Sequence, residues 1–174
     1  MRKWYTIHVE QGKELLVKLY LEKFANINDF QILLPRYIRF EWKNGEKYCV
    51  EKLIFKNYIF IFVDMTPTTY YEILRFPNIH SILGHGDSIQ VIAQNEIENI
   101  LKLVDNDGII QMTEVYFVKG EIEFIKGPLC GHSNMICKIN KRKCRAYINI
   151  NIGGSILPIG LGLMPLERET RDAE

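Results

Sequence analysis

The chain has 174 residues, of which 47% are hydrophobic and 25% are charged, with a formal net charge of +1. This composition predicts a folded globular protein with packed cores and excludes a disordered chain. The longest apolar run, residues 58–63, has the length of a strand and is far shorter than the roughly 18–20 residues that cross a bilayer. The basic N-terminus lacks a signal-peptide apolar region, so we expect a cytoplasmic protein whose four cysteines are reduced thiols.

The small net charge hides a basic block. Residues 1–118 carry 13 Lys/Arg against 15 Asp/Glu, whereas residues 119–164 carry seven against two, a net of +5. The last ten residues, 165–174, carry two against four. A basic block inside a near-neutral chain indicates an anionic partner, which composition alone does not identify.

The first part of the chain alternates between strand-like and helix-like patterns. Strands are predicted where β-branched and aromatic residues gather, at 3–9, 30–42, 47–55, 58–63 and 79–83. Asn44-Gly45 predicts a tight hairpin turn between the second and third of these strands.

Three helices are predicted between these strands. The first covers 13–25, and its apolar stripe is expected to contain Leu16, Leu19, Tyr20 and Phe24. The second has Thr66 as its cap and Pro67 at its first position, and it ends before Pro77. The third covers 96–104, with Ile97, Ile100, Leu101 and Val104 as its buried stripe.

The composition changes after the polar turn at 105–108. From Phe117 onward, short apolar runs are separated by glycine-containing turns, which predicts a small β-barrel. We therefore predict an α+β protein with domains at 1–106 and 117–166, joined by a linker at 107–116 and followed by a polar tail at 167–174.

The order of the motifs resembles the NusG family. Trp4-Tyr5 opens the first strand, and Gly12 precedes the first helix. Residues 55–60, Phe-Lys-Asn-Tyr-Ile-Phe, are similar to the family's central strand, with Lys56 in place of the usual proline. Gly120-Glu121-Ile122-Glu123-Phe124 and Gly127-Pro128-Leu129 are similar to the opening of its KOW domain. The residues Asn-Tyr-Ile-Phe at 57–60 and the compact length are most like those of the specialised antiterminators LoaP and RfaH. The many β-branched residues of the C-terminal module favour the LoaP type.

One position departs from this resemblance. Asn134 stands where the KOW motif has a glycine in a left-handed turn. Asparagine tolerates that conformation better than other non-glycine residues, so we expect the barrel to form with Asn134 in a left-handed turn.

The resemblance implies a NusG-type N-terminal α/β sandwich, an antiparallel sheet with three helices, followed by a small KOW β-barrel. It also implies an aromatic surface that binds the clamp helices of the largest subunit of RNA polymerase, and a second contact with the opposite lobe. The residues at these positions are Phe55, Tyr58, Phe60, Thr68 and Thr69. Periodicity alone favours the other interpretation of Tyr58 and Phe60, as ordinary core aromatics.

A cluster of cations is the candidate nucleic-acid site. It lies around a predicted hairpin turn, has no carboxylate nearby in the sequence, and consists of Lys138, Lys141, Arg142, Lys143 and Arg145. A solvated turn is an equally good interpretation of the charge alone. Tyr147 follows the cluster and would either stack on an unpaired base or cover the barrel.

No metal, cofactor or catalytic site is predicted. Cys130, Cys137 and Cys144 are separated by six residues each, whereas structural zinc sites pair their ligands at shorter spacing, so zinc at these cysteines and His132 is disfavoured. The sequence contains no phosphate-binding glycine loop, nucleophile elbow or His-Glu-x-x-His helix.

These features predict a non-enzymatic transcription elongation factor or processive antiterminator. It would bind RNA polymerase through the N-terminal domain and nucleic acid through the KOW domain. Leader RNA is the first candidate for that nucleic acid, and upstream or non-template DNA is the second. The alternative is a general elongation factor whose KOW domain binds Rho or a ribosomal protein. We expect a monomer without a membrane contact, associated with the nucleoid through the polymerase.

Overall fold

The computed structural model describes residues 1–85, 88–118 and 120–167, which form two compact units. The first unit comprises Met1–Pro35, Leu53–Leu101 and Asn151–Ser155, and the second comprises Arg36–Lys52, Lys102–Ile150 and Ile156–Glu174. Residues 36–52, inside the predicted N-terminal domain, thus group with the C-terminal residues, and the predicted domain division stays a prediction. Beyond Glu167, the predicted polar tail lies outside the described residues.

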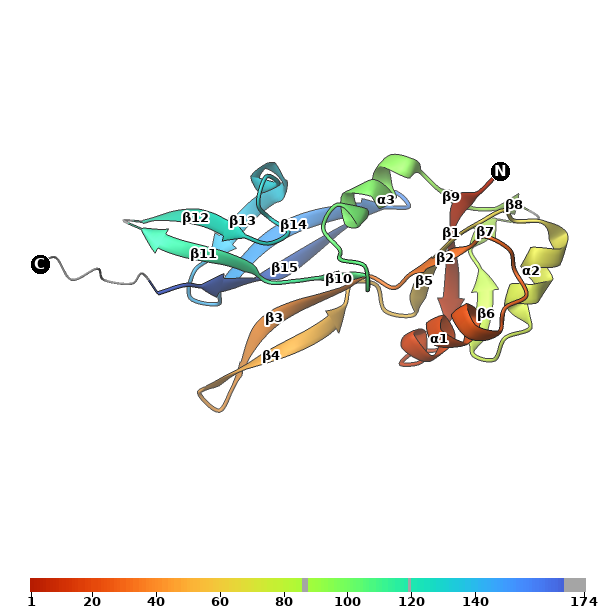
Figure 1. Ribbon diagram of the computed structural model, residues 1–174, viewed down its shortest axis with the longest axis horizontal. Helices are drawn as coiled ribbons and strands as arrows, with labels where there is room; N and C mark the ends of the chain where they lie inside the picture. The colour runs from red at the N-terminus through yellow and green to blue at the C-terminus, as the bar shows by residue number, and fades with distance from the viewer. Residues whose placement is uncertain (86–87, 119, 168–174) are drawn as a thin grey trace, which may run out of the picture. The chain divides into compact units, whose positions relative to one another are not determined.

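The first unit is built around the central strand β1 (Lys3–Val9), shown in red in Figure 1. Strand β1 pairs antiparallel with three strands, β5 (Tyr58–Val63), β6 (Ile79–Ile82) and β9 (Val91–Ile92). Strand β2 (Gln31–Leu33) continues the sheet beyond β5, and β7 (Gly84–His85) pairs separately with β8 (Ser88–Ile89).

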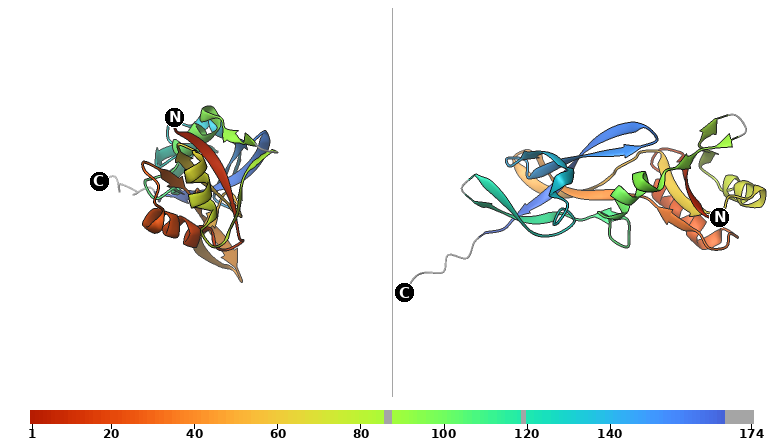
Figure 2. Two further views of the ribbon diagram at one scale, coloured as in Figure 1. Left: turned by 90° about the vertical axis from the view of Figure 1, so that its right-hand side faces the viewer. Right: turned by 90° about the horizontal axis from the view of Figure 1, so that it is seen from above.

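One face of this sheet carries the core of the first unit. Alternate residues of β1 and β5 point into it, namely Tyr5, Ile7, Val9, Ile59, Ile61 and Val63. Helix α1 (Glu14–Phe24) adds Val17 and Leu21, and helix α2 (Pro67–Leu74) adds Ile73. Both helices therefore pack on the same face, as the two views of Figure 2 also indicate.

The predicted apolar stripe of α1 is wrong. The buried residues are Glu14, Val17 and Leu21, whereas Leu19 and Phe24 are 52% and 56% exposed. The Glu14 carboxylate accepts a hydrogen bond from the Asn57 backbone N–H at 2.9 Å. Val17 and Leu21 lie three and seven residues after Glu14, so the three residues share the helix face that meets the core.

The other two helices are near their predicted positions. At the start of α2, the Thr66 hydroxyl accepts a hydrogen bond from the Thr69 backbone N–H, and Pro67 occupies the first turn, as predicted. Helix α3 (Gln94–Leu101) buries Ile97 and Ile100 as predicted. It ends at Leu101, which is 37% exposed, and Val104 lies beyond it, so the second half of the predicted stripe is wrong.

The second unit contains the predicted hairpin, formed by β3 (Arg36–Lys43) and β4 (Glu46–Leu53). Asn44 and Gly45 have φ angles of 53° and 84°, as both central residues of a tight type I′ turn require. Strand β10 (Ile109–Ile110) pairs parallel with β3 on the other side.

The rest of the second unit is a five-stranded sheet in the order β12-β11-β15-β14-β13. The strands are β11 (Thr113–Val118), β12 (Glu121–Lys126), β13 (Ile136–Asn140), β14 (Arg145–Ile152) and β15 (Ser155–Pro165). It curves into a half-barrel around Val115, Leu129, Ile148 and Leu163, each 0% exposed. This agrees with the predicted KOW-type barrel and with the α+β class. No helix in the described ranges is long and apolar enough to cross a membrane.

The prediction for Asn134 is wrong. Residues Ser133–Met135 form a short 3₁₀ turn, and Asn134 is not among the described residues with a positive φ. Gly131 is left-handed instead, with a φ of 78°. Asn134 therefore lies inside this 3₁₀ turn and needs no left-handed conformation.

We predict that Glu14→Ala lowers the free energy of unfolding by about 1–3 kcal/mol, because it leaves the backbone N–H of Asn57 without its partner in a partly buried site. Denaturant titration of the full chain measures the change. Glu22→Ala is the control on the same helix, since it removes only the exposed Lys18–Glu22 ion pair, which is worth less than about 1 kcal/mol. Equal losses in the two variants would contradict the role assigned to Glu14.

Candidate functional site

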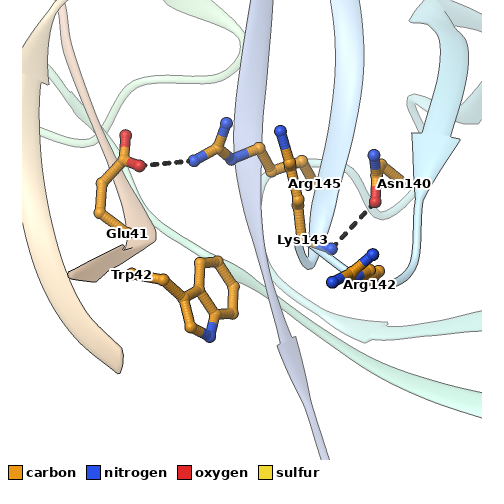
Figure 3. A pocket seen from close by; sticks show the side chains of 6 residues that line it. All are labelled: Glu41, Trp42, Asn140, Arg142, Lys143 and Arg145. Atoms are coloured by element: carbon orange, nitrogen blue, oxygen red, sulfur yellow. Dashed lines mark hydrogen bonds and ion pairs between the residues drawn. The ribbon is translucent and has the colours of Figure 1, made fainter. Parts of the chain in front are cut away.

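The cation cluster is organised by a tight turn between β13 and β14, residues 140–145, which we call the basic turn. The Asn140 side-chain oxygen accepts a hydrogen bond from the Lys143 backbone N–H at 2.9 Å, as Figure 3 shows. The Cys144 backbone N–H donates to the Lys141 carbonyl at 3.1 Å, and Cys144 is left-handed with a φ of 48°. These bonds hold the turn so that Lys141, Arg142 and Lys143 are exposed.

The other predicted members of the cluster differ in their surroundings. Lys138 on β13 is exposed. The ammonium of Lys141 donates to the Gly120 carbonyl and lies 5.8 Å from the centre of the Phe117 ring. Tyr147 is half-buried, and its ring lies so close to Gly160 that an added Cβ would approach it to 3.0 Å. Tyr147 therefore covers the barrel, which was the alternative interpretation of this residue.

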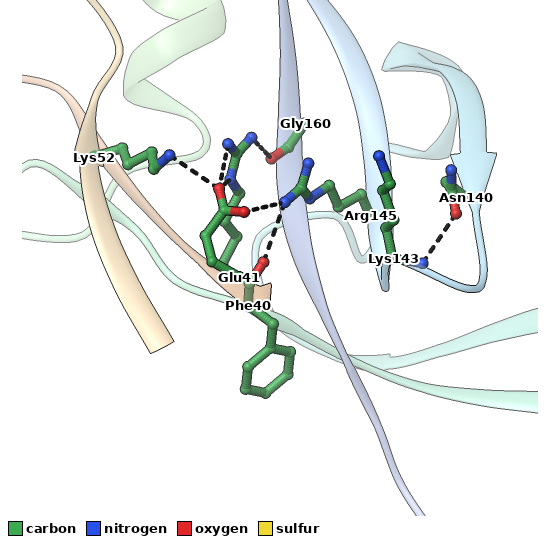
Figure 4. Close-up of polar contacts among 8 residues, drawn as sticks. Phe40, Glu41, Lys52, Asn140, Lys143, Arg145 and Gly160 are labelled. Atoms are coloured by element: carbon green, nitrogen blue, oxygen red, sulfur yellow. Dashed lines mark hydrogen bonds and ion pairs between the residues drawn. The ribbon is translucent and has the colours of Figure 1, made fainter. Parts of the chain in front are cut away.

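Arg145 is not a free cation, which corrects the expectation that no carboxylate neutralises the cluster. It is 9% exposed, and its Nη2 lies 2.8 Å from the Glu41 carboxylate and 3.3 Å from the Phe40 carbonyl. Figure 4 shows these contacts joining β14 to the hairpin. The acid lies 104 residues away in the sequence, so local charge counting cannot find it.

Glu41 is the centre of a small ion cluster within the second unit. Its carboxylate also contacts the ammonium of Lys52 at 2.9 Å and the guanidinium of Arg39 at 2.6 Å. The hydrogen bond from Lys52, opposed by burial and reinforced by Arg39 and Arg145, lowers the pKa of Glu41 from 4.5 to about 2. Glu41 is therefore ionised across the physiological range.

Close backbone packing accompanies this ion cluster. An added Cβ at Gly162 of β15 would lie 2.5 Å from the Ile38 carbonyl and 2.8 Å from the Cα of Arg39. Only glycine permits this approach of the barrel to the hairpin. The Arg39 guanidinium also donates to the Gly160 carbonyl at 3.4 Å. The hairpin thus docks on the barrel through both charge and shape.

The docked hairpin and the basic turn enclose a pocket of about 760 Å³, visible in Figure 3. Its lining residues are Glu41, Trp42, Asn140, Arg142, Lys143 and Arg145. Glu41 and Trp42 were not among the predicted site residues, because nothing in the sequence links the hairpin to residues 140–145.

The predicted aromatic site lies on the face of the first unit's sheet opposite its apolar core. Tyr58 is partly exposed, and its ring centre lies 5.2 Å from that of His8, which in turn lies 5.1 Å from that of His80. Phe60 is only 2% exposed and packs edge-on against Phe55 at 5.2 Å. The expectation that Phe60 is an exposed aromatic is therefore wrong, whereas Tyr58 and Phe55 keep accessible surface.

The predicted second contact lies at the start of α2. Thr68 is exposed, and Thr69 is partly buried. The Thr69 hydroxyl lies 3.0 Å from that of Thr66, and its backbone N–H is bound to the Thr66 cap. Thr68 is therefore the accessible member of the pair, and Thr69 maintains the helix start.

The cysteines do not gather into a metal site. All four are free, and Cys137 is exposed while Cys144 is buried. In the part of the chain that the structure describes, no three or more His, Cys, Asp or Glu side chains are placed to hold a metal ion.

Comparison with known proteins links this architecture to one family. The family model described as "Transcription termination factor nusG" matches residues 2–101. The transcription termination/antitermination protein NusG of Bacillus subtilis is 26% identical, over 96% of this chain and 98% of its own. That of Campylobacter jejuni is 22% identical, over 95% and 97%. The solved structure entitled "Domain interaction in Thermotoga maritima NusG" matches 93% of this chain and 94% of its own, with a TM-score of 0.55 and 20% identity, and so supports the fold.

We predict that Glu41→Gln destabilises the second unit by up to about 3 kcal/mol near pH 7, the value that corresponds to a pKa lowered from 4.5 to about 2. A carboxyl group with a lowered folded-state pKa stabilises the fold above its unfolded pKa. This contribution disappears as the pH falls through the folded value. The difference between wild type and variant should therefore be full above about pH 5 and vanish towards pH 2.

Denaturant titrations at several pH values, followed by tryptophan fluorescence, measure this difference. Glu51→Gln is the control on the other hairpin strand, where the 44%-exposed Glu51 side chain pairs with Arg36. It should change the free energy of unfolding by less than about 1 kcal/mol. A pH-independent effect of Glu41→Gln would contradict the ion-cluster account.

Proposed function

Because the chain belongs to the NusG family of transcription termination and antitermination factors, we propose that it is a processive antiterminator that binds RNA polymerase and nucleic acid through separate surfaces. The observation that carries the proposal is the basic turn, which exposes three consecutive cations on a hydrogen-bonded turn. Phosphate recognition needs accessible cations that are not already neutralised.

The polymerase contact is proposed at Tyr58 and Phe55, and the buried Phe60 supports Phe55 through an edge-on ring contact. An aromatic residue that is partly exposed on a rigid strand buries a large area at a small cost in side-chain entropy. Tyr58 follows Asn57, whose backbone N–H is held by Glu14, so its position is fixed before any partner binds. The clamp helices of the largest subunit are the proposed partner, and Thr68 is the proposed contact with the opposite lobe.

The nucleic-acid contact is proposed at Lys138, Lys141, Arg142 and Lys143. Arg145 supports it indirectly, because its ion pair with Glu41 fixes the start of β14. In residues 120–167, no Asp or Glu forms an ion pair with these four cations. They therefore remain available for phosphates, of leader RNA in the first place.

The proposed mechanism is a population shift. A protein that binds the clamp and the opposite lobe together favours the closed, processive polymerase by the difference between its affinities for the closed and open states. Nucleic acid bound at the basic turn would raise the local concentration of the protein at the transcription complex that carries this nucleic acid. No catalytic step is part of this role, and the protein would act as a monomer on the nucleoid, in the cytoplasm.

We predict that Tyr58→Ala weakens binding to purified core polymerase by roughly 1–3 kcal/mol, as the loss of an aromatic interface residue does. Titration of labelled polymerase measures the affinity, and circular dichroism checks the fold. Phe24→Ala removes a 56%-exposed aromatic from α1 and should leave the affinity unchanged. A folded Tyr58→Ala protein with wild-type affinity would contradict the assignment.

We predict that wild-type affinity for leader RNA falls with salt, at a slope of log affinity against log salt of about −0.7 per single-strand phosphate neutralised. Replacing Lys141, Arg142 and Lys143 with alanine should flatten this slope by roughly two units. Polymerase binding should be unaffected, since the changes lie outside the first unit.

The control replaces three exposed lysines of the first unit, Lys3, Lys13 and Lys23, with alanine, which lowers the net charge equally. Its salt slope should match that of the wild type. If both triple variants behave alike, or if the wild type binds RNA no better than a generic basic protein, the RNA contact fails. A general elongation factor whose barrel binds Rho or a ribosomal protein is then the better account.

A further inference from the structure

The pocket between the hairpin and the basic turn is lined by an exposed tryptophan as well as by members of the cation cluster. Its volume of about 760 Å³ lies within the roughly 300–1,000 Å³ typical of small-ligand sites. One wall is a tryptophan of β3, and the other carries Arg142 and Lys143. A pocket with an aromatic wall opposite a cationic wall suits a ligand that has both an aromatic ring and an anionic group.

The indole of Trp42 is supported but accessible. Its ring centre lies 6.4 Å from that of Phe40 at an interplanar angle of 68°, an edge-to-face contact. The ammonium of Lys47 lies 3.8 Å from the centre of the Phe40 ring and holds it in turn. Trp42 nevertheless remains 40% exposed, and Figure 3 shows it projecting towards the basic turn. An exposed indole fixed by its neighbours is a preformed stacking surface for a base.

The charges around Trp42 favour an anion. Glu41 is the acidic residue of the lining, and it is already shared by Arg39, Lys52 and Arg145. Arg142 and Lys143 form no ion pair with any described residue. Arg145 is more than nine-tenths buried, and its Nε has no hydrogen-bond partner in the described chain. The pocket is therefore positive even though it contains a carboxylate.

We propose that this pocket binds one unpaired nucleotide of a single-stranded nucleic acid, with its base stacked on Trp42 and its flanking phosphates on Arg142 and Lys143. The inference rests on the proposed nucleic-acid contact and names its substrate class. The nucleotide must be unpaired, because a base inside a duplex offers no free face to the indole. The site is composite, since the base would lie on the hairpin and the phosphates on the barrel.

The test compares single-stranded and double-stranded probes. An oligouridylate of about 12 nucleotides covers one site of this class, and its duplex with oligoadenylate has the same backbone without free bases. Wild-type protein should bind the single strand with quenching of tryptophan fluorescence. Trp42→Ala should abolish the quenching and weaken single-strand binding roughly 10- to 100-fold, leave the salt slope unchanged, and leave duplex binding intact.

Two further variants separate stacking from a general effect on the hairpin. Trp42→Phe keeps an aromatic ring and should recover most of the affinity. Tyr48→Ala removes another exposed aromatic from the same hairpin, 43% exposed and outside the pocket lining, and should bind as the wild type does. Repeating the titration with oligodeoxyuridylate shows whether RNA or DNA is preferred, and single-strand binding that depends on Trp42 supports the site with either sugar.

The proposal is overturned if Trp42→Ala leaves single-strand affinity unchanged, or weakens single-strand and duplex binding equally. If RNA binding then still depends on Lys141, Arg142 and Lys143, the proposed RNA contact at the basic turn is supported without the pocket. If the wild type binds neither probe, the pocket and the proposed RNA contact fail together.

Discussion

The carboxylate of Glu41 is the point on which the arrangement of the second unit depends. It accepts contacts from Arg39 and Lys52 on the hairpin and from Arg145 on the barrel, and these cations favour its charged form and lower its pKa to about 2. A buried arginine without this partner would be costly, and a hairpin without this contact would lose its polar attachment. Gly162 adds the shape that lets the two backbones approach. Together these features create the pocket.

The ion cluster also divides the cations of the basic block into two groups. Arg145 has a structural role, because its guanidinium donates hydrogen bonds to the Glu41 carboxylate and the Phe40 carbonyl. Arg142 and Lys143, three and two residues earlier, face the pocket without an acidic partner in the described chain. A sequence count treats these residues as equivalent, but burial and pairing make one structural and leave the others available for binding.

A buried carboxylate has a comparable role in the first unit. Glu14 is 3% exposed and accepts the backbone N–H of Asn57, which has a left-handed φ of 68°. This bond joins α1 to the residue that precedes Tyr58. The proposed polymerase contact and the proposed nucleotide pocket thus each stand beside a carboxylate that is used for positioning.

Local signals in the sequence determined the elements themselves. The Asn44-Gly45 turn, the Thr66-Pro67 helix start and the alternating pattern of 58–63 each act over a few residues, so they could be read without the fold. The resemblance of the motifs to one family supplied the α+β architecture. Only the tertiary structure decided that Glu14, Val17 and Leu21 form the buried face of α1, that Phe60 is buried, and that Trp42 and Glu41 meet the basic turn. The reason is physical: these outcomes depend on contacts between residues far apart in the chain, here 43 and 104 positions, whose energies local periodicity does not contain.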